Sequence, residues 1–146
     1  MVEVRPLRAE DEARWRALWR GYLGYYETTR PEAVYAATFR RLLDPAEPMH
    51  GRVSVAEGEA TGLCHHIFHR HCWFETDACY LQDLFVAPER RGDGSARALI
   101  ENVYREADEA GAASVYWLTQ EFNYRGRALY DRVAARTPFI KYQRPA

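Results

Sequence analysis

The feature that most constrains this chain is a short basic turn with two glycines, set between an apolar run and an amphipathic stretch. The apolar run ends at Val86, and residues 87–94 follow as Ala-Pro-Glu-Arg-Arg-Gly-Asp-Gly. From Ala96 onward, apolar side chains recur with the spacing of one helix face. Glycine lets the backbone come close to an anion, and the first amides of a helix direct partial positive charge toward it. The strand, turn and helix therefore predict a phosphate-binding loop.

Hydrophobic periodicity divides the rest of the chain into elements. The helical period predicts helices from near Glu10 to Tyr26, from Pro31 to a stop before Pro45, over residues 96–107 with a stop at Gly111, and over residues 124–135. A period of two predicts strands at residues 2–6, 52–56, 61–69, 79–86, 114–118 and 139–143. The order β-α-α-β-β-β-α-β-α-β is typical of a mixed α/β sheet with helices on both sides.

Length and composition indicate one ordinary globular domain over residues 1–146. The chain is 47% hydrophobic and carries 20 basic and 21 acidic residues, so its net charge of −1 gives no reason to expect nucleic acid or a membrane as partner. Its first residues lack the apolar stretch of a signal peptide, and no run is long enough to span a bilayer. Three cysteines without CxxC spacing suggest reduced thiols. We therefore expect a cytoplasmic protein.

The loop differs from a Walker loop and from a dinucleotide fingerprint, but three stretches resemble a known family. Residues 91–96 have the form Arg-x-x-Gly-x-Ala, which resembles the acetyl-CoA signature of the GCN5-related N-acetyltransferase (GNAT) superfamily. Residues 80–86, Tyr-Leu-Gln-Asp-Leu-Phe-Val, resemble a strand of its polyamine-type members. Residues 115–134 are similar to a microbial branch with yeast histone, polyamine and D-amino-acid acetyltransferases. The resemblance covers nearly the whole chain.

The resemblance implies a fold and a co-substrate. The expected fold is a mixed, mostly antiparallel central sheet that splays between two strands, with helices on both faces. The expected activity is transfer of the acetyl group of acetyl-CoA to a primary amine, such as a polyamine or an amino acid, by direct attack in a ternary complex. The residues expected to bind the coenzyme are Leu84, Phe85, Val86, Arg91, Gly92, Asp93, Gly94, Ser95, Ala96 and Asn123.

The resemblance also implicates a general acid. Asn123 and Tyr130 match the family's Asn-x6-Tyr pattern, which places Tyr130 about two turns into the last helix. A phenol there would protonate the departing thiolate. Without the family match, Asn123 would be read as a helix cap and Tyr130 as a core residue.

The proton acceptor does not carry over. Gln82 stands where polyamine-type enzymes carry glutamate, and an amide is no base at neutral pH. Asp83 is one candidate, to accept the amine's proton or bind a cationic substrate, and Glu27 after the first helix is a second. Glu121, a histidine and water stay as further alternatives, and so does a purely structural role for Asp83.

A run of histidines and cysteines over residues 64–72 suggests metal binding, but its members alternate between strand faces, so we predict no metal site. Three alternative functions remain: a protein-lysine acetyltransferase, a non-catalytic acyl-CoA-binding module, and a metal-binding regulatory domain. The short last strand, residues 139–143, has few residues with which to complete the sheet. Because related proteins exchange such strands, we expect a homodimer.

Overall fold

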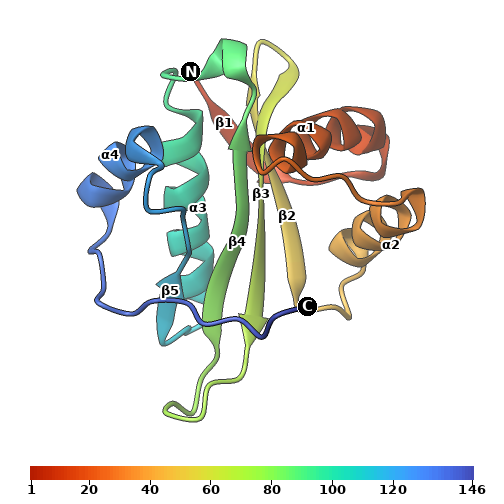
Figure 1. Ribbon diagram of the computed structural model, residues 1–146. Coiled ribbons are helices and arrows are strands. Elements are labelled where there is room, and N and C mark those ends of the chain that lie inside the picture. Colours follow the sequence, from red (N-terminus) through yellow and green to blue (C-terminus); the bar gives the residue numbers. More distant parts are fainter.

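A five-stranded mixed sheet runs through the centre of the protein, as the computed structural model of residues 1–146 shows (Figure 1). The strands lie in the order β1-β2-β3-β4-β5. Antiparallel pairing joins the first four, and β5 alone runs parallel to its neighbour β4. Their bounds are β1 Glu3–Pro6, β2 Met49–Ala56, β3 Glu59–His69, β4 Ala78–Val86 and β5 Ser114–Tyr116.

Helices cover both faces of this sheet, as expected (Figure 1). On one face, α1 (Glu12–Tyr25), which follows the 3-10 turn η1 (Ala9–Asp11), and α2 (Glu32–Leu43) enclose a core around Trp15, Phe39 and Leu63. On the other, α3 (Ser95–Glu109) and α4 (Tyr124–Val133) pack over a second core that includes Leu99 and Ile100. No helix is both long and apolar enough to cross a membrane.

A β-bulge at Gln82 decides which side chains of β4 share a face. His65 of β3 pairs with Asp83, whereas the next residue, His66, pairs with Leu81, so Gln82 is an extra residue in β4. One extra residue shifts the side-chain alternation of a strand by one position. Asp83 therefore points to the α1 face, where an unbroken strand would have presented Gln82.

The sheet opens between β4 and β5. Only Ala78 to Tyr80 of β4 pair with β5, opposite Ser114 to Tyr116. The C-terminal part of β4, up to Val86, has no partner on that side. This confirms the expected splay and leaves a backbone edge available to an extended ligand.

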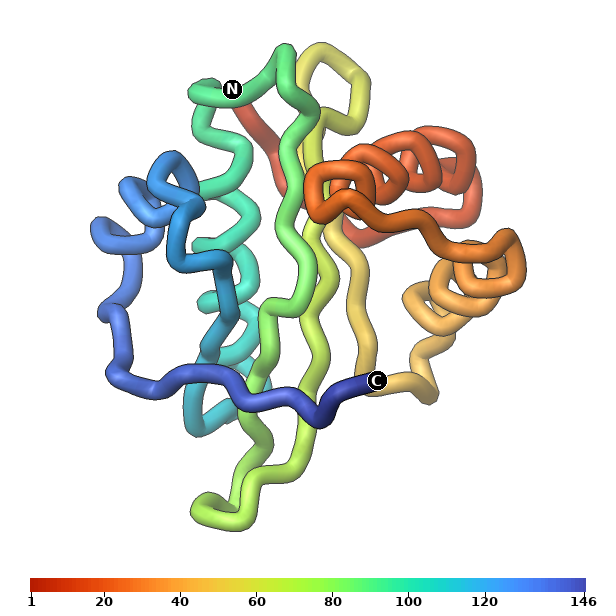
Figure 2. Tube along the Cα trace, in the orientation of Figure 1, coloured from red at the N-terminus to blue at the C-terminus, as the bar shows by residue number.

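The predicted last strand, residues 139–143, is wrong: this segment is not a strand in the structure. Residues 134–146 have no regular structure, and in Figure 2 they run across the strands rather than along β5. Within one chain no strand lies beside this segment, so its alternating pattern lacks the ladder hydrogen bonds that would make it a strand. The strand predicted at residues 114–118 also ends earlier, at Tyr116.

Candidate active site

The loop between β4 and α3 has the geometry of an anion-binding turn. Pro88–Arg90 form a 3-10 turn, η2, and Gly92 and Gly94 then take the left-handed φ values of 88° and 91°. Gly94 is the N-cap of α3. The backbone N–H groups of Gly92, Gly94 and Ala96 have no acceptor in the chain. Three unpaired amides around a helix N-terminus fit a pyrophosphate, whose oxygens only accept hydrogen bonds.

Side chains of the same loop hold its shape. The Asp93 carboxylate accepts a hydrogen bond from the Ser95 amide at 2.9 Å, and the Ser95 hydroxyl lies 3.1 Å from that of Thr61 on β3. Arg91 folds back, donating to the Val86 carbonyl at 3.3 Å with its guanidinium over the Phe85 ring. Arg91 is thus fixed at the end of β4.

A cavity of about 360 Å³ adjoins this loop. It lies between α1, represented by Gly21 and Tyr25, and the β4 end with Phe85 and Arg91. A Cβ at Gly21 would come within 2.8 Å of the Phe85 ring, so glycine there permits close packing of α1 on β4. The cavity thus extends from α1 to the loop.

Asp83 lies in a chain of hydrogen bonds that begins in the core. The Trp15 indole N–H donates to His65 Nε2 at 2.9 Å, and His65 Nδ1 is 2.7 Å from Asp83 Oδ2. The Trp19 indole N–H donates to the same oxygen at 3.3 Å. Burial raises the pKa of Asp83, but the hydrogen bonds from His65, Tyr22 and Trp19 outweigh it and lower this pKa overall. Asp83 is therefore a carboxylate at neutral pH.

Tyrosines line the surroundings of Asp83. Tyr22, whose hydroxyl lies 3.4 Å from the Gln82 carbonyl oxygen, faces the carboxylate, and it packs edge to face on Tyr26. Tyr80 stacks on Tyr116 at 4.8 Å between ring centres, and the Tyr116 hydroxyl lies 2.8 Å from His69 Nε2. These rings give Asp83 largely aromatic surroundings.

Tyr130 belongs to the opposite wall. It extends from α4, packs edge to face on Trp117, and its hydroxyl has no hydrogen-bond partner. Burial, with smaller contributions from Tyr26 and Tyr25, raises its pKa to about 12. In Figure 1, α1 and α4 stand on opposite sides of the C-terminal half of β4. Tyr130 is thus a protonated phenol near the unpaired edge of the sheet.

The other predicted residues lie at the rim. Glu27 is exposed, takes a left-handed φ of 56° just past α1, and forms no ion pair. Asn123 caps α4: its Oδ1 accepts from the Gly126 amide, and its Nδ2 donates to Thr119. Glu121 is exposed. The capping interpretation of Asn123 is confirmed, while a contact of Asn123 with the coenzyme stays a prediction.

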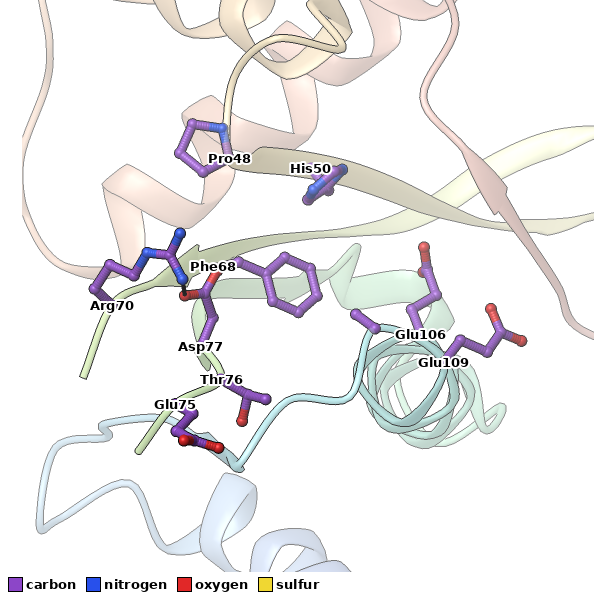
Figure 3. A pocket seen from close by; sticks show the side chains of 10 residues that line it. Pro48, His50, Phe68, Arg70, Glu75, Thr76, Asp77, Glu106 and Glu109 are labelled. Atoms are coloured by element: carbon purple, nitrogen blue, oxygen red, sulfur yellow. Dashed lines mark ion pairs between the residues drawn. The ribbon is translucent and has the colours of Figure 1, made fainter. Parts of the chain in front are cut away.

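The histidines of residues 64–72 divide between the two faces, as the strand alternation indicated. His65 contacts α1, whereas His66 stacks on His50 beneath α3. No group of three or more histidine, cysteine, aspartate or glutamate side chains is arranged to hold a metal. A larger cavity of about 730 Å³, lined by Phe68, Asp77 and Glu109 among others, lies by the C-terminal end of α3 (Figure 3). It includes none of the predicted site residues.

Comparison with known proteins decides the family. Residues 15–134 match the Acetyltransferase (GNAT) family. The chain belongs to the GNAT acetyltransferase family. This GNAT protein is 36% identical to the D-amino-acid N-acetyltransferase HPA3 of Saccharomyces cerevisiae over 145 residues, which cover 98% of this chain and 90% of the yeast protein.

Solved GNAT structures share the fold of this GNAT chain at low sequence identity. The aminoglycoside acetyltransferase AAC(6')-Iy, in complex with the bisubstrate analog CoA-S-monomethyl-acetylneamine, superposes with a TM-score of 0.85 at 19% identity, covering 100% of this chain and 99% of that one. A ribosomal-protein-alanine N-acetyltransferase from Brucella melitensis biovar Abortus 2308 gives 0.81 at 21% identity, with 100% of both chains covered.

The sequence did not reveal the partners of Asp83. In the sequence, Trp15 and Trp19 are apolar positions within the predicted first helix, and His65 is one of several histidines in residues 64–72. Their indole and imidazole nitrogens meet Asp83 because the bulge at Gln82 sets the register, and no residue in β4 signals that bulge.

Proposed function

We propose that the protein transfers the acetyl group of acetyl-CoA to a primary amine of a small molecule. The observation that carries this proposal is the set of unpaired amides at Gly92, Gly94 and Ala96 beside the unpaired edge of β4. The family and the yeast relative, named for amine acetylation, support the same reaction. The protein is an acetyl-CoA-dependent N-acetyltransferase.

The coenzyme-binding residues belong to two neighbouring segments, the loop before α3 and the open edge of β4. The loop from Arg91 to Ala96, with Gly92, Asp93, Gly94 and Ser95, binds the pyrophosphate, and the backbone of Leu84, Phe85 and Val86 pairs with the pantetheine arm. Asn123 fixes the start of α4 beside it. When bound, acetyl-CoA supplies the thioester. A backbone N–H on the open edge of β4 polarises its carbonyl, which stabilises the negative charge that develops during attack.

Asp83 and Tyr130 then have complementary tasks. The ionised Asp83 binds the incoming amine and helps to remove its proton, directly or through water, with Glu27 as the alternative acceptor. Tyr130 donates a hydrogen bond to the departing sulfur. A phenol of pKa about 12 is a weaker acid than a thiol of about 8.5, so a full transfer would cost about 5 kcal/mol. Its main contribution is therefore a hydrogen bond that stabilises the developing thiolate.

Direct transfer is favoured over an acetyl-cysteine intermediate. Cys64 and Cys79 are buried, and burial raises the pKa of both thiols, that of Cys79 to about 11. A thiol that stays protonated is a poor nucleophile. Cys72 is exposed on the loop between β3 and β4, at the other end of the sheet from the coenzyme loop. Three free cysteines also fit a reducing compartment, the cytoplasm.

A D-amino acid is the first acceptor to test, because the yeast relative is named for that class. Polyamines, aminoglycosides and peptides with a free lysine complete the panel. The first measurement is thermal unfolding with and without acetyl-CoA, since ligand at 100 times its dissociation constant adds about 2.7 kcal/mol of stability. Release of free thiol with each amine then reports turnover.

Each result leads to a different conclusion. A stability gain with thiol release supports the proposed function. A stability gain without turnover on any amine indicates a non-catalytic acyl-CoA-binding module. No gain at millimolar acetyl-CoA removes the acetyltransferase proposal, and an acetylated cysteine found by mass spectrometry removes direct transfer.

The exposed tail supports a homodimer. Phe139, Ile140 and Tyr142 are 82%, 75% and 89% exposed, although their pattern is that of a strand. The edge of β5 that faces away from β4 has no partner. A tail from a second copy would fill that edge and bury the three side chains. This arrangement also gives residues 139–143 the ladder that one chain lacks.

Light scattering tests the dimer. Wild-type protein at micromolar concentration is expected at twice the chain mass of 17.0 kDa. The double variant Phe139→Asp/Ile140→Asp is expected at the single mass. Trp73→Asp is the control, because Trp73 is equally exposed but lies on the loop between β3 and β4, and it should leave the dimer intact. A wild-type monomer would contradict the proposal.

A further inference from the structure

The hydrogen bonds around Asp83 fix the tautomer of His65. An indole N–H can only donate, so the Trp15 bond requires that His65 Nε2 be unprotonated. The proton of a neutral imidazole then sits on Nδ1, from where it is donated to Asp83 Oδ2. Protonating His65 would set two donors against each other inside the core. His65 is therefore a fixed neutral donor and not a proton acceptor.

The Trp15 indole cannot easily move away. Its ring is 1% exposed and packs against Trp19 at 5.3 Å and Phe39 at 5.1 Å between ring centres. His65 is similarly buried, at 3% exposed. A buried donor that loses its acceptor destabilises the fold, so this chain of bonds is maintained.

The two oxygens of Asp83 consequently differ. Oδ2 accepts from both His65 and Trp19, whereas Oδ1 accepts from neither, and the Tyr22 hydroxyl is a further donor beside the carboxylate. The groups that face the carboxylate are His65 on β3, Trp19, Tyr22 and Tyr26 on or just after α1, and Tyr80 on β4. None of them carries a positive charge. A cation supplied by a ligand would complete this site.

We propose that Trp15 and His65 are positioning residues that hold Asp83 with Oδ1 directed to the cleft, so that the acceptor is recognised as a primary ammonium among tyrosine rings. The inference rests on the proposed function, and it adds that the enzyme recognises the ammonium group of its acceptor. Tyrosine faces add cation–π attraction to the charge of Asp83. The amine thus binds charged beside Asp83 and releases its proton to solvent before attack.

Three variants separate positioning from packing. His65→Leu removes the donor to Asp83. His65→Asn keeps an amide N–H near the position of Nδ1 and serves as the conservative control. Trp15→Phe keeps an aromatic ring but removes the donor to His65 Nε2, so that the tautomer of His65 is no longer fixed.

Carboxyl NMR titration gives a readout that does not depend on activity. In wild-type protein and His65→Asn, Asp83 is expected to titrate below the usual range of an aspartate, and in His65→Leu above it, because burial then prevails. Imidazole ¹⁵N shifts are expected to show His65 with a protonated Nδ1 and an unprotonated Nε2 in the wild type, and to show that this preference is lost in Trp15→Phe. A wild-type His65 with its proton on Nε2 overturns the inference.

Kinetics test the substrate class. With the best amine of the panel, His65→Leu is expected to raise KM for the amine at least tenfold and to move the acidic limb of kcat/KM to higher pH. KM for acetyl-CoA should stay within twofold. Equal losses in His65→Leu and His65→Asn, or an unchanged pH profile in His65→Leu, would show that His65 only packs. If the wild type acetylates no amine, the proposed function fails, and the NMR titrations still decide the positioning role.

Discussion

At the scale of single residues, the Tyr130 hydroxyl provides the sharpest test of catalysis. Tyr130→Phe keeps the ring against Trp117 and removes one donor. We expect kcat to fall about 100-fold with both KM values little changed, which is the lower end of general-acid contributions. Because the pKa of Tyr130 is raised to about 12, the loss should be the same at every pH from about 6 to 9.

Tyr104→Phe is the matched control for this prediction. Tyr104 also packs near Trp117, but its hydroxyl donates to the Val133 carbonyl at 2.9 Å instead of facing the cleft. Removing this bond is expected to lower the free energy of unfolding by about 1 kcal/mol and to leave kcat unchanged. Similar kcat losses in both variants would assign Tyr130 to packing.

The two candidate carboxylates differ in their surroundings, which predicts unequal effects. Asp83 is held by His65 and Trp19, whereas Glu27 is exposed without a partner. Asp83→Asn is therefore expected to reduce kcat/KM for the amine about 100-fold, and Glu27→Gln less than about threefold. Steady-state kinetics at constant acetyl-CoA measure both. A larger effect of Glu27→Gln would move the acceptor's binding group to the end of α1.

At the scale of elements, the coenzyme loop can be tested against a turn of the same conformation. Gly94 and Gly58 both have left-handed φ values, 91° and 78°, and an added Cβ would meet no atom within 4 Å at either position. Gly94→Ala and Gly58→Ala are each expected to cost about 1 kcal/mol in unfolding experiments. Only Gly94→Ala should also weaken acetyl-CoA binding, by about tenfold in calorimetry, because its methyl group crowds the free amides. Equal affinities would place the phosphates elsewhere.

The elements around that loop were predictable from the sequence because their signals are local. The strand before it, the two glycines and the apolar stripe of α3 each follow from neighbouring residues, and the structure matches their bounds within two residues. The bulge at Gln82 was not predictable, since it depends on the pairing of His65 and His66 with a strand far along the chain. The partners of Asp83 depend on that register.

The C-terminal segment shows a different limit. Its alternation predicts a strand, yet a strand exists only where a neighbour supplies hydrogen bonds. In this chain β5 is three residues long, and the tail turns away from it. A local sequence pattern does not indicate whether the strand that would pair with this segment belongs to the same chain or to another copy.

At the scale of the whole molecule, the two faces of the sheet carry different groups of polar residues. The α1 face holds Asp83 and the tyrosines, and the α3 face holds a buried polar group around His66 and Glu106. Arg52 forms an ion pair with Glu106, and both ring nitrogens of the fully buried His66 lack a partner. The second group takes no part in the proposed reaction, so it should affect stability and not catalysis.

His66 predicts how this stability depends on pH. Burial lowers its pKa to about 4, whereas an unfolded histidine titrates near 6.5. Below pH 6.5 the unfolded chain binds a proton that the folded protein rejects, so the free energy of unfolding decreases as pH falls, until about pH 4. The total loss attributable to His66 is of the order of 3 kcal/mol, and buried carboxylates such as Glu106 add to it only below about pH 4.5.

Denaturant unfolding at several pH values between 7 and 4.5 measures this slope. His66→Leu fills most of the same volume without a titrating group, so its slope should be shallower than that of the wild type, the remainder coming from His50, whose pKa burial also lowers. His71→Asn, on the loop between β3 and β4, should keep the wild-type slope. Acetyl transfer at pH 7.5 should be unchanged in both variants, because neither residue contacts the α1 face. An equal slope in His66→Leu and the wild type would mean that the pKa of His66 does not change on folding, which would contradict the prediction.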